Sequence, residues 1–496
     1  MNLSMLLEMA AQGAGDRIAL GSRHGGITYA EMLDRTRATA AWLDGQHRPN
    51  VGILDQNSEA IPLLLFGAGM SGRVFAPLNY RLAPEALASI LERLAPALIV
   101  TGDDISLPAG ATGDLEAIDR SEYLVATTKT PDKEAFWMPD PDDIAVLLFT
   151  SGTTGAPKGA VLRHRHLVNY IISTVEFLGS TEDEAALISV PPYHVAGISA
   201  ILSSVYSGRR MVQMESFQPD TWVGLARDEH ITHAMVVPTM LGRILDVIER
   251  EGIGLPHLRH LSYGGGRMPV STIERALSLL PGVDFVNAYG LTETSSTIAV
   301  LTPDDHRDAL SSDDPTARRR LASVGRPLPT LELEVRDPEG TVLSVGEVGE
   351  IHVRGEQVSG EYLGGAVLDA EGWFATKDGG FVDAEGFLFV EGRLDDVIVR
   401  GGENMSPGEI EETLLAHDSV VEVGVFGVPD TEWGEKVVAA VVIAEGTQPT
   451  EAELQEWVRS HLRSSRTPAR VLFIEELPYN DTGKLLRRVL RASFAD

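Results

Sequence analysis

The chain has 496 residues and a mass of 53.5 kDa, and 43% of its residues are hydrophobic and 23% charged. A chain of this length and composition folds into two or more compact domains rather than staying disordered. Its formal net charge of -31 argues against partners that are bound through clustered Lys and Arg, namely nucleic acid and anionic lipid surfaces.

Neither cysteine chemistry nor a targeting segment is visible in the sequence. No cysteine is present, which excludes disulfides, thiolate metal sites and a cysteine nucleophile. The first residues, MNLSMLLEMAAQ, lack the basic start of a secretory signal and carry Glu8 early. The apolar stretches 61–70 and 437–444 are far shorter than the roughly 20 residues that a membrane span requires. We therefore expect a cytoplasmic protein with no stable membrane association.

From about residue 50 to about residue 300, apolar runs of strand length alternate with segments of helical period. The helical pattern is clearest over residues 164–178, where apolar side chains recur at helical spacing. The strand-like runs cover residues 144–149, 186–190, 234–237 and 285–288. This alternation predicts an α/β fold with a mainly parallel sheet covered by helices.

Glycine-rich or polar clusters directly follow four strand-like runs. These clusters are FTSGTTGAPKG at 149–159, PPYHVAG at 191–197, YGGGRMP at 263–269 and YGLTET at 289–294, the third of them after a short run at 260–262. In open α/β sheets the ligand crevice lies at the carboxyl ends of the strands. We therefore expect the four loops to converge on one site.

The last third of the chain has a different pattern. Residues 331–392 contain short alternating strands joined by Gly and Asp turns, which predicts a small barrel-like or antiparallel unit. After Arg393 we expect a strand at 397–400, a helix at 407–417, strands near 420–427 and 436–444, and another helix, whose start carries the capping-box pair Thr450 and Glu453. We predict an N-terminal domain over 1–393, a hinge at 394–396 and a C-terminal α+β domain over 397–496.

The cluster at 149–159 has the composition of a phosphate-binding loop. Backbone amides of a glycine loop, a helix start and hydroxyl donors together form a cradle for phosphate oxygens. Hydroxyl groups come from Ser151, Thr153 and Thr154, and Lys158 supplies a positive charge. A Walker loop requires Gly directly before its Lys, whereas Pro157 stands there, so that class of loop is excluded.

The stretch TSGTTGAPKGA resembles the phosphate loop of the adenylate-forming superfamily, which includes acyl-CoA and aryl-CoA synthetases, amino-acid adenylation domains and luciferases. Further stretches match the motifs of that superfamily in the same order: ITYAEM, PLNYRL, PPYHVAG, YGGG, YGLTET, GEIHVRG, WFATKDGGFVDAEGFLFVEGR, GGENMSPGEIE and NDTGKLLRR. The resemblance implies a large N-terminal domain and a small, mobile C-terminal one. It also implies a reaction in which ATP and a carboxylic acid form an acyl-adenylate and pyrophosphate, after which coenzyme A displaces AMP. ATP, Mg²⁺ and coenzyme A, the last as a co-substrate, are the ligands implied.

The resemblance assigns roles to individual residues. Glu293 matches the carboxylate that binds Mg²⁺, and Thr292 matches the threonine that bonds the α-phosphate. Lys484 matches the catalytic lysine of the C-terminal domain, which reaches the substrate carboxylate and the α-phosphate. The positions implied for nucleotide and coenzyme binding are Thr150, Ser151, Gly152, Thr153, Thr154, Gly155, Lys158, Gly264, Gly265, Gly266, Asn287, Ala288, Tyr289, Gly290, Asp378, Arg393, Gly402, Glu403 and Trp433.

For the nucleoside, the resemblance implies that Tyr289 packs against adenine, that Asp378 accepts both ribose hydroxyls and that Arg393 supports ribose and phosphate. The chain departs from the superfamily here, because the usual Thr-Gly-Asp reads Thr376-Lys377-Asp378. Lys377 either restricts the turn or approaches a phosphate.

For the second half-reaction, Asp395 resembles the hinge residue about which the small domain rotates. Rotation would bring Gly402 and Glu403 to the tunnel for the pantetheine arm of coenzyme A. Trp433 resembles an aromatic residue that packs the nucleotide of coenzyme A in some aryl-CoA ligases, and a tryptophan of the core is the alternative.

The acid pocket is implied at His194, Val195, Gly264, Gly265 and Gly290. Amino-acid adenylation domains hold the α-ammonium group with an aspartate after the aromatic residue of the PPYHVAG region, and Val195, Ala196 and Gly197 offer no such partner. An aromatic, alicyclic or short-to-medium acyl acid is therefore favoured. His194 is either a pocket residue, with a catalytic role beside the carboxylate, or a structural histidine. Arg267, where smaller residues are usual, either contacts a polar acid or faces solvent.

Rival functions share the same nucleotide residues. An acyl-adenylate ligase that loads a carrier protein differs only in its acceptor, and a long-chain fatty acyl-CoA synthetase differs only in its acid. A catalytically silent binding protein is disfavoured because Glu293, Asp378 and Lys484 are all present. Whether the protein forms a homodimer stays open at this point.

Overall fold

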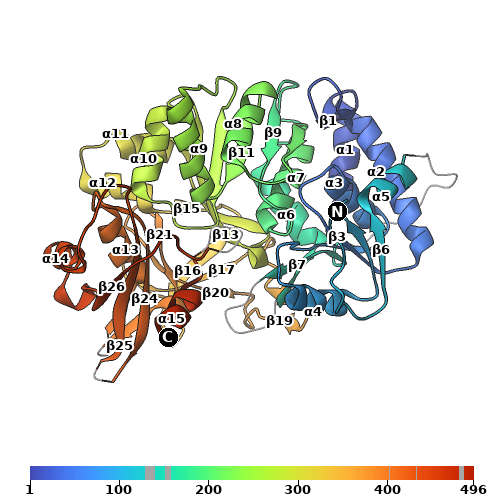
Figure 1. The fold of residues 1–496 in the computed structure, drawn as a ribbon. Helices are drawn as coiled ribbons and strands as arrows, with labels where there is room; N and C mark the ends of the chain where they lie inside the picture. Colours follow the sequence, from blue (N-terminus) through green and yellow to red (C-terminus); the bar gives the residue numbers. More distant parts are fainter. Residues whose placement is uncertain (129–139, 151–157, 401–402, 432, 480–484, 496) are drawn as a thin grey trace.

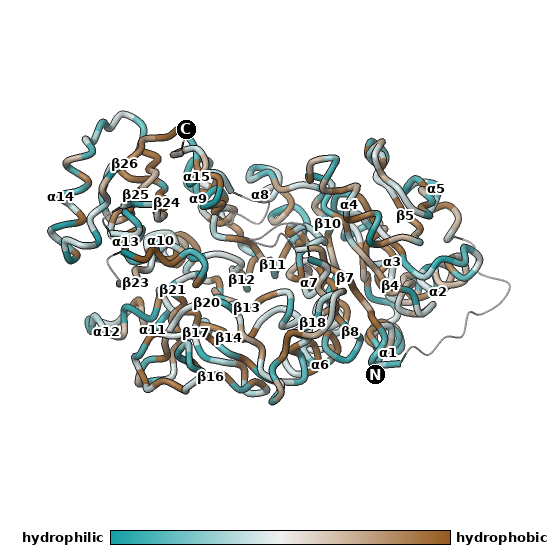
Figure 2. The backbone as a smooth tube through the Cα atoms, turned by 90° about the horizontal axis from the view of Figure 1, so that it is seen from below, coloured by the Kyte–Doolittle hydropathy of each residue, from teal (hydrophilic) through white to brown (hydrophobic). Residues whose placement is uncertain are grey.

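The computed structural model describes residues 1–128, 140–150, 158–400, 403–431, 433–479 and 485–495. In Figure 1 the chain runs from an N-terminal region in blue, through a green sheet, to a C-terminal unit in red beside the yellow segments. Figure 2 shows that much of the hydrophilic colour lies in elements at the rim, such as α12 and α14.

The larger sheet has the strand order β15-β14-β13-β12-β11-β9-β10-β1-β2. From β1 through β10, β9, β11 and β12 to β13 the neighbouring strands are parallel, whereas β14 runs antiparallel to β13. The bounds are β1 Ile18–Leu20, β2 Ile27–Thr28, β9 Ala185–Ile188, β10 Arg210–Gln213, β11 His233–Val236, β12 His260–Gly264, β13 Asp284–Leu291, β14 Ser296–Leu301 and β15 Arg326–Pro327.

A second sheet has the strand order β19-β18-β8-β7-β4-β3-β5-β6. Its strands β7, β4, β3, β5 and β6 are parallel, and β8 is antiparallel to β7. The bounds are β3 Asn50–Leu54, β4 Val74–Pro77, β5 Ala97–Thr101, β6 Leu115–Asp119, β7 Ile144–Thr150, β8 Lys158–Arg163, β18 Glu361–Tyr362 and β19 Gly365–Ala366. The predicted parallel α/β arrangement is thus confirmed, but it is divided between two sheets.

Helices fill the space between the sheets and cover their outer faces. Side chains of α1, α3, α6 and α7 join those of both sheets in one buried core, and every residue of α3 is buried. The bounds are α1 Ser4–Ala14, α2 Tyr29–Gln46, α3 Ala60–Met70, α4 Pro84–Leu94, α5 Arg120–Ala126, α6 His164–Thr174, α7 Val195–Ser207, α8 Pro219–Asp228, α9 Pro238–Glu251, α10 Val270–Leu279, η1 Thr292–Thr294, α11 Pro303–Ser311, α12 Pro315–Arg318 and η2 Arg319–Ala322. Within the described ranges, no helix has the length and apolar character to cross a membrane.

An antiparallel unit follows, with the order β16-β17-β20-β21, as the alternating pattern of residues 331–392 predicts. The bounds are β16 Glu332–Arg336, β17 Gly349–Arg354, β20 Phe374–Val382 and β21 Leu388–Arg393. This unit packs against β14 of the larger sheet through an apolar cluster that includes Ile298, Ile351 and Val353.

The C-terminal part carries a sheet of its own, in the order β23-β22-β25-β24 with β26 beside β25. Its buried side chains, among them Ile410, Val425 and Val458, form clusters drawn from residues 398–494 alone. The predicted capping box is present, because Thr450 accepts from the Glu453 backbone N–H at the start of α14. The bounds are η3 Leu394–Asp396, β22 Ile398–Arg400, β23 Glu403–Met405, α13 Pro407–Leu415, β24 Val420–Asp430, β25 Gly434–Ile443, α14 Glu451–His461, η4 Ser464–Arg466, β26 Arg470–Phe473 and α15 Arg487–Ala495.

Two element ends differ from the sequence-based prediction. The helix predicted over 164–178 ends at Thr174, because Val175 is extended, with φ -126° and ψ 134°, and Leu178 has a positive φ of 50°. Strand β13 continues to Leu291, well into YGLTET, because β14 pairs with it through Leu291 and Ser296. Helical spacing and strand length are local signals, and tertiary pairing decides where an element stops.

Candidate active site

Three of the four predicted loops leave one edge of the larger sheet. They follow the carboxyl ends of β9, β12 and β13, and these strands belong to one run of neighbours together with β11. The fourth loop follows β7 in the second sheet, whose strand β8 packs against the η1 turn at the end of β13. The two sheets therefore meet where the predicted site residues lie.

The phosphate-loop prediction needs one correction. Ser151, Gly152, Thr153, Thr154 and Gly155 lie outside the described residues, but the chain on both sides of them forms an antiparallel pair, with Thr150 opposite Lys158. Lys158 therefore opens strand β8, and helix α6 begins only at His164. A helix start does not follow this loop directly, so a helix dipole cannot be its source of positive potential.

Glu293 lies in the η1 turn, directly after β13. Only 8% of the residue is exposed. Its backbone carbonyl accepts from the N–H groups of Ser359 at 2.8 Å and Gly360 at 3.1 Å, so the turn is anchored to the chain segment that precedes β18. These bonds fix the backbone on which the predicted Mg²⁺ carboxylate stands, beside Thr292.

Tyr362 of β18 contacts that carboxylate. Its hydroxyl donates to Oε1 of Glu293 at 2.5 Å, and its ring lies 5.5 Å from Nζ of Lys158. Burial and then the Glu293 charge raise the pKa of Tyr362, so the phenol stays protonated and remains a donor. The sequence-based analysis missed Tyr362, because a tyrosine in the stretch SGEYLGG has no spacing that marks it as functional.

The two residues predicted to hold the ribose face each other across β20 and β21. Asp378 pairs in register with Arg393, and their side chains form an ion pair of 3.1 Å between Oδ1 and Nε. The hydroxyl of Tyr289 donates to Oδ2 of Asp378 at 2.6 Å. Burial, followed by the Asp378 charge, raises the pKa of Tyr289. A carboxylate has about four acceptor positions, so Asp378 retains capacity for further donors.

A bulge in β20 places Asp378. The register between β17 and β20 shifts between Glu350 and His352, and Lys377 has a φ of 61°, in the left-handed region. The Lys377 side chain is exposed, while its N–H donates to Oε1 of Glu350 at 3.0 Å. Bulges redirect side chains beside active sites. The structure shows the restricted turn at Lys377, and the phosphate contact stays a prediction.

The glycine segment at the end of β12 lets two strands approach closely. A Cβ at Gly264 would lie 2.2 Å from the carbonyl oxygen of Ala288 on the neighbouring strand β13. Gly265 has a φ of 78°, a conformation that favours glycine. Gly266 has neither constraint, since a Cβ there would meet Pro238 at an ordinary 3.7 Å.

The other predicted positions of the acid and adenine region cluster at the same strand ends. His194 precedes the first residue of α7, Val195, and its ring packs edge-on against Tyr193 with centroids 4.6 Å apart. Gly290 pairs with Thr297, so it lies on the β13 and β14 side of the site. Asn287 is buried, and its side-chain amide donates to the carbonyl of Ser323 at 3.1 Å.

The coenzyme-side predictions fall around the β22 and β23 hairpin. Gly402 lies outside the described residues, and Glu403 begins β23, opposite Arg400. Trp433 is 48% exposed, so it is not a core tryptophan. The guanidinium of Arg400, which the sequence-based analysis did not single out, lies 5.7 Å from the Trp433 ring centroid.

The predicted hinge residue Asp395 lies between two residues whose side chains are anchored, Arg393 and Asp396. On one side of Asp395, Arg393 bonds the carbonyl of Thr376 at 2.7 Å. On the other side, Asp396 pairs at 3.4 Å with Arg487 of α15. Asp395 itself is exposed in the η3 turn. Lys484, which precedes α15, lies outside the described residues.

Of the two alternatives for Arg267, the structure shows the solvent-exposed side chain, and it adds an ion pair that the sequence did not indicate. Nη2 of Arg267 forms an ion pair of 2.6 Å with Glu412 on α13. The loop that follows β12 is therefore tied to the C-terminal part of the chain.

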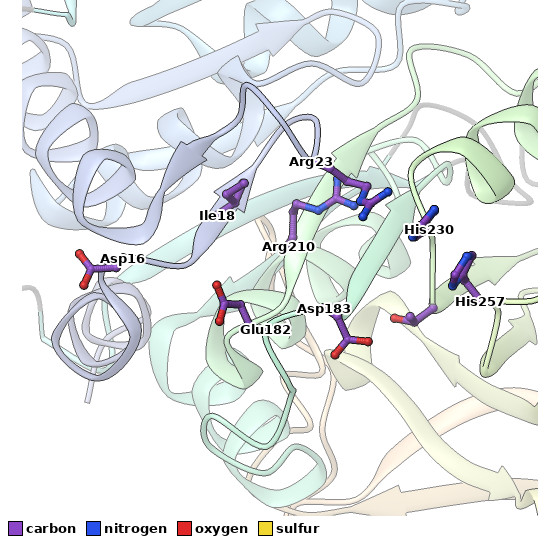
Figure 3. Close-up of a pocket in the computed structure, with 9 residues that line it drawn as sticks. Asp16, Ile18, Arg23, Glu182, Asp183, Arg210, His230 and His257 are labelled. Atoms are coloured by element: carbon purple, nitrogen blue, oxygen red, sulfur yellow. The ribbon is translucent and has the colours of Figure 1, made fainter.

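A separate cavity of about 320 Å³ lies away from these loops, at the amino ends of β9, β10 and β11 (Figure 3). Figure 3 shows Arg23 beside Arg210, and the rings of His230 and His257 stack at 3.7 Å. Its described lining residues include none of the predicted site positions. The predicted chemistry therefore belongs to the opposite end of the larger sheet.

Two family models match the chain. The model described as AMP-binding enzyme covers residues 7–363, and the model described as AMP-binding enzyme C-terminal domain covers residues 409–484. Among curated proteins, the fatty acid–[acyl-carrier-protein] ligase ScoC of Streptomyces coeruleorubidus is 34% identical over 466 residues, covering 90% of this chain and 86% of that protein. Feruloyl-CoA synthase of an Amycolatopsis species is 33% identical over 488 residues, covering 96% of each chain.

Solved structures agree with these matches. The o-succinylbenzoate CoA synthetase MenE of Bacillus subtilis, solved with the acyl-adenylate intermediate OSB-AMP, superposes with a TM-score of 0.85 at 29% identity, covering 98% of this chain and 97% of that one. The same enzyme has been solved with ATP and a magnesium ion, and that structure also gives a TM-score of 0.85 at 29% identity, covering 99% of each chain. The chain therefore belongs to the family of AMP-binding enzymes.

Proposed function

We propose that this protein is an ATP-dependent carboxylic acid:CoA ligase that works through an acyl-adenylate. One observation supports this most directly. The paired Asp378 and Arg393 of the antiparallel unit contact Tyr289 of β13, through a hydrogen bond from its hydroxyl to Asp378. The Glu293 carboxylate stands in the η1 turn at the end of the same strand β13, so a nucleoside and its phosphates would be held side by side there. The AMP-binding enzyme model spans Tyr289 and Glu293. Asp378 and Arg393 lie between the two matched ranges.

In the first half-reaction, a carboxylate oxygen of the acid attacks the α-phosphorus of ATP, and the bond to pyrophosphate breaks. The attack brings anions together, so charge that develops in the transition state must be met by fixed donors and cations. We assign Asp378 and Arg393 to the ribose, Thr292 and Lys484 to the α-phosphate, and Lys158 with the adjoining loop to the β- and γ-phosphates.

Glu293 fits Mg²⁺, because its buried carboxylate supplies the hard oxygen ligand that this ion prefers. Mg²⁺ in such sites is bound by one or two carboxylates together with substrate phosphates, and it offsets phosphate charge when bound. The role of the residues around Glu293 is to hold its carboxylate in place.

In the second half-reaction, the thiol of coenzyme A attacks the acyl carbon, the bond to AMP breaks, and a thioester forms. We propose that residues 397–496 form a mobile domain that turns about Asp395 between the two steps. Supporting this division, the C-terminal part has a core of its own and is joined to the rest through the η3 turn. Arg400 and Trp433 are then the side chains that would meet the nucleotide of coenzyme A.

The acid is proposed to be aromatic, alicyclic or a short-to-medium acyl acid. The pocket residues, His194, Val195 and the glycines after β12, offer no carboxylate to pair with an α-ammonium group. A cytoplasmic location belongs to the same proposal, because ATP and coenzyme A are both available there.

A carrier-protein ligase is the second candidate, and the ScoC match favours it. That relative is named a fatty acid–[acyl-carrier-protein] ligase and is 34% identical over 466 residues. Such an enzyme would share every nucleotide residue with a CoA ligase and differ in the thiol that it accepts.

A pyrophosphate-release assay tests the proposal. Purified protein is incubated with ATP, Mg²⁺ and a panel of aromatic, alicyclic, short, medium and long-chain acids, in three arms: no acceptor, coenzyme A, and a phosphopantetheinylated carrier protein. We expect an acid-dependent release of pyrophosphate that coenzyme A accelerates by removing the adenylate. Acceleration only by the carrier protein would favour the second candidate, and no release with any acid would reject both.

A further inference from the structure

We propose that Tyr362 is a positioning residue for the metal-binding carboxylate, and that it links this carboxylate to the lysine of the phosphate loop across the junction of the two sheets. The proposal rests on the proposed function, since it assigns Tyr362 a part in holding Mg²⁺ and ATP. It adds a residue that no motif of the sequence indicates.

The backbone of Tyr362 is fixed to the phosphate-loop side of the junction. Tyr362 pairs with Ala160 on β8, only two residues beyond Lys158. The preceding residue, Glu361, accepts two hydrogen bonds from the guanidinium of Arg163, at 2.8 and 2.7 Å. A forked pair of this kind restricts orientation as well as distance. Strand β18 is thereby held on β8.

The side chain of Tyr362 then reaches the other sheet. Its hydroxyl donates to Oε1 of Glu293 at 2.5 Å, and Glu293 follows directly on β13 of the larger sheet. The same turn accepts backbone donors from Ser359 and Gly360. Residues 359–362 therefore hold Glu293 in two ways. Two backbone N–H groups bond its carbonyl, and the Tyr362 hydroxyl bonds its carboxylate.

The contact has a consequence for metal binding. A hydrogen bond to one carboxylate oxygen orients the group and leaves the other oxygen for a metal ion. Partners of this kind typically change metal affinity by about 10-fold to 100-fold when they are removed. The ring adds a second contact, because it lies 5.5 Å from Nζ of Lys158, within the range of a cation–π attraction.

Tyr362→Phe separates the two contacts, since it removes the hydroxyl and keeps the ring. We expect this variant to bind Mn²⁺–ATP about 10-fold more weakly than the parent protein, as measured by the electron paramagnetic resonance signal of bound Mn²⁺ without any acid present. The KM for Mg²⁺ should rise by a similar factor in pyrophosphate release, while the KM for the acid stays unchanged. Tyr362→Leu, which also removes the ring, should weaken ATP binding further at saturating metal.

Two controls separate positioning from a general loss of structure. Tyr170→Phe is matched, because the Tyr170 hydroxyl bonds Thr297 of β14 at 3.2 Å and makes no contact with Glu293, and it should leave Mn²⁺–ATP binding unchanged. In a Glu293→Gln background, adding Tyr362→Phe should cause no further loss, because the two residues act through one bond.

The outcomes are distinct. Equal Mn²⁺–ATP affinity in the parent protein and Tyr362→Phe would overturn the inference and leave the proposed function standing. Equal losses in Tyr362→Phe and Tyr170→Phe would also overturn it, as would additive losses in the double variant. Failure of the parent protein to bind Mn²⁺–ATP would overturn the proposed function and this inference together.

Discussion

At the scale of single residues, Lys377 shows how backbone conformation and side-chain chemistry can be confused in a sequence. A lysine beside an aspartate that is predicted to bind ribose suggests a phosphate contact, yet the residue has a φ of 61° and an exposed side chain. The left-handed conformation costs a residue with a Cβ roughly 1–2 kcal/mol. Glycine, which is usual at this position, adopts the left-handed conformation without this cost. Lys377 adopts the same conformation with strain.

Lys377→Gly should therefore stabilise the protein. We expect the free energy of unfolding in urea to rise by about 1 kcal/mol, because the strain exceeds the entropy that glycine adds to the unfolded chain. The KM for ATP should stay within a factor of two, since the bulge that places Asp378 is kept. Lys377→Ala removes the ammonium group but keeps the Cβ, and it should bring no gain. If both variants raise the KM for ATP severalfold, the ammonium group acts on a phosphate after all.

At the scale of elements, the η3 turn is the short link between strand β21 and the C-terminal part of the chain, and the residues on both sides of Asp395 are held by ion pairs. Arg393 is paired with Asp378, and Asp396 is paired with Arg487 of α15. Asp395 lies between these two paired residues. Rotation of the C-terminal part would have to be taken up by the backbone of about this one residue.

Asp395→Pro should affect the two half-reactions unequally. Proline fixes φ near -65°, so adenylate formation should persist if the turn already suits it, whereas thioester formation should slow by about 10-fold or more. Pyrophosphate release and thioester formation from supplied acyl-adenylate measure the two steps separately. Asp395→Ala is the matched control, since it removes the carboxylate and leaves the backbone free to rotate. Unchanged rates in both steps for Asp395→Pro would exclude a hinge at this residue.

The ion pair between Arg267 and Glu412 is the second contact at this scale. Its side chains are 41% and 53% exposed, and pairs that are this accessible to solvent contribute only about 0–1 kcal/mol. Such a pair can favour the arrangement in which α13 lies next to the loop after β12, but it is too weak to lock α13 in that position.

Reversal of one charge, Arg267→Glu, should shift the ratio of the two half-reaction rates by about fivefold or less, because a free energy below 1 kcal/mol allows no more. The double variant Arg267→Glu with Glu412→Arg should restore the ratio at low salt. Separate measurement of the two steps at low and high ionic strength checks this expectation. A loss of 100-fold, insensitive to salt, would mean that Arg267 contacts the substrate instead.

At the scale of the whole molecule, a buried histidine makes stability depend on pH. His164 is 1% exposed, and its Nδ1 accepts from the Leu3 N–H at 3.3 Å. Burial lowers the pKa of His164 from 6.5 to about 4, with Asp143 opposing that change and the N-terminal amino group adding to it. Above pH 6.5 the folded and unfolded states both hold a neutral imidazole. As the pH falls from 6.5 toward 4, only the unfolded state takes up the proton, so stability is lost.

We therefore expect the free energy of unfolding to fall on acidification over this range, with His164 contributing up to about 1.4 kcal/mol per pH unit. Urea unfolding at pH 7, 6 and 5 measures the slope. In His164→Asn the side-chain oxygen can still accept from Leu3, but the titrating group is gone, so the slope should be shallower although the variant is less stable at pH 7. Parallel slopes for the two proteins would show that His164 does not contribute.

The sequence by itself determined the fold class and the order of the functional motifs along this chain. The alternation of apolar runs predicted the α/β arrangement, which the structure confirms, and the ordered motifs predict that Glu293, Asp378 and Arg393 belong to one site. Both signals are local in the chain, because strand length, helical period and loop composition are set by neighbouring residues.

Contacts between segments that are far apart in the chain were decided only by the tertiary structure. Tyr362 meets Glu293 across 69 positions, and Arg267 meets Glu412 across 145, so neither pair follows from spacing. Nor could the sequence show that the phosphate-loop strand continues into an antiparallel partner, or that the parallel strands divide between two sheets. Strand partners are chosen by burial of apolar faces and by backbone hydrogen bonding over the whole fold, and local composition carries no record of that choice.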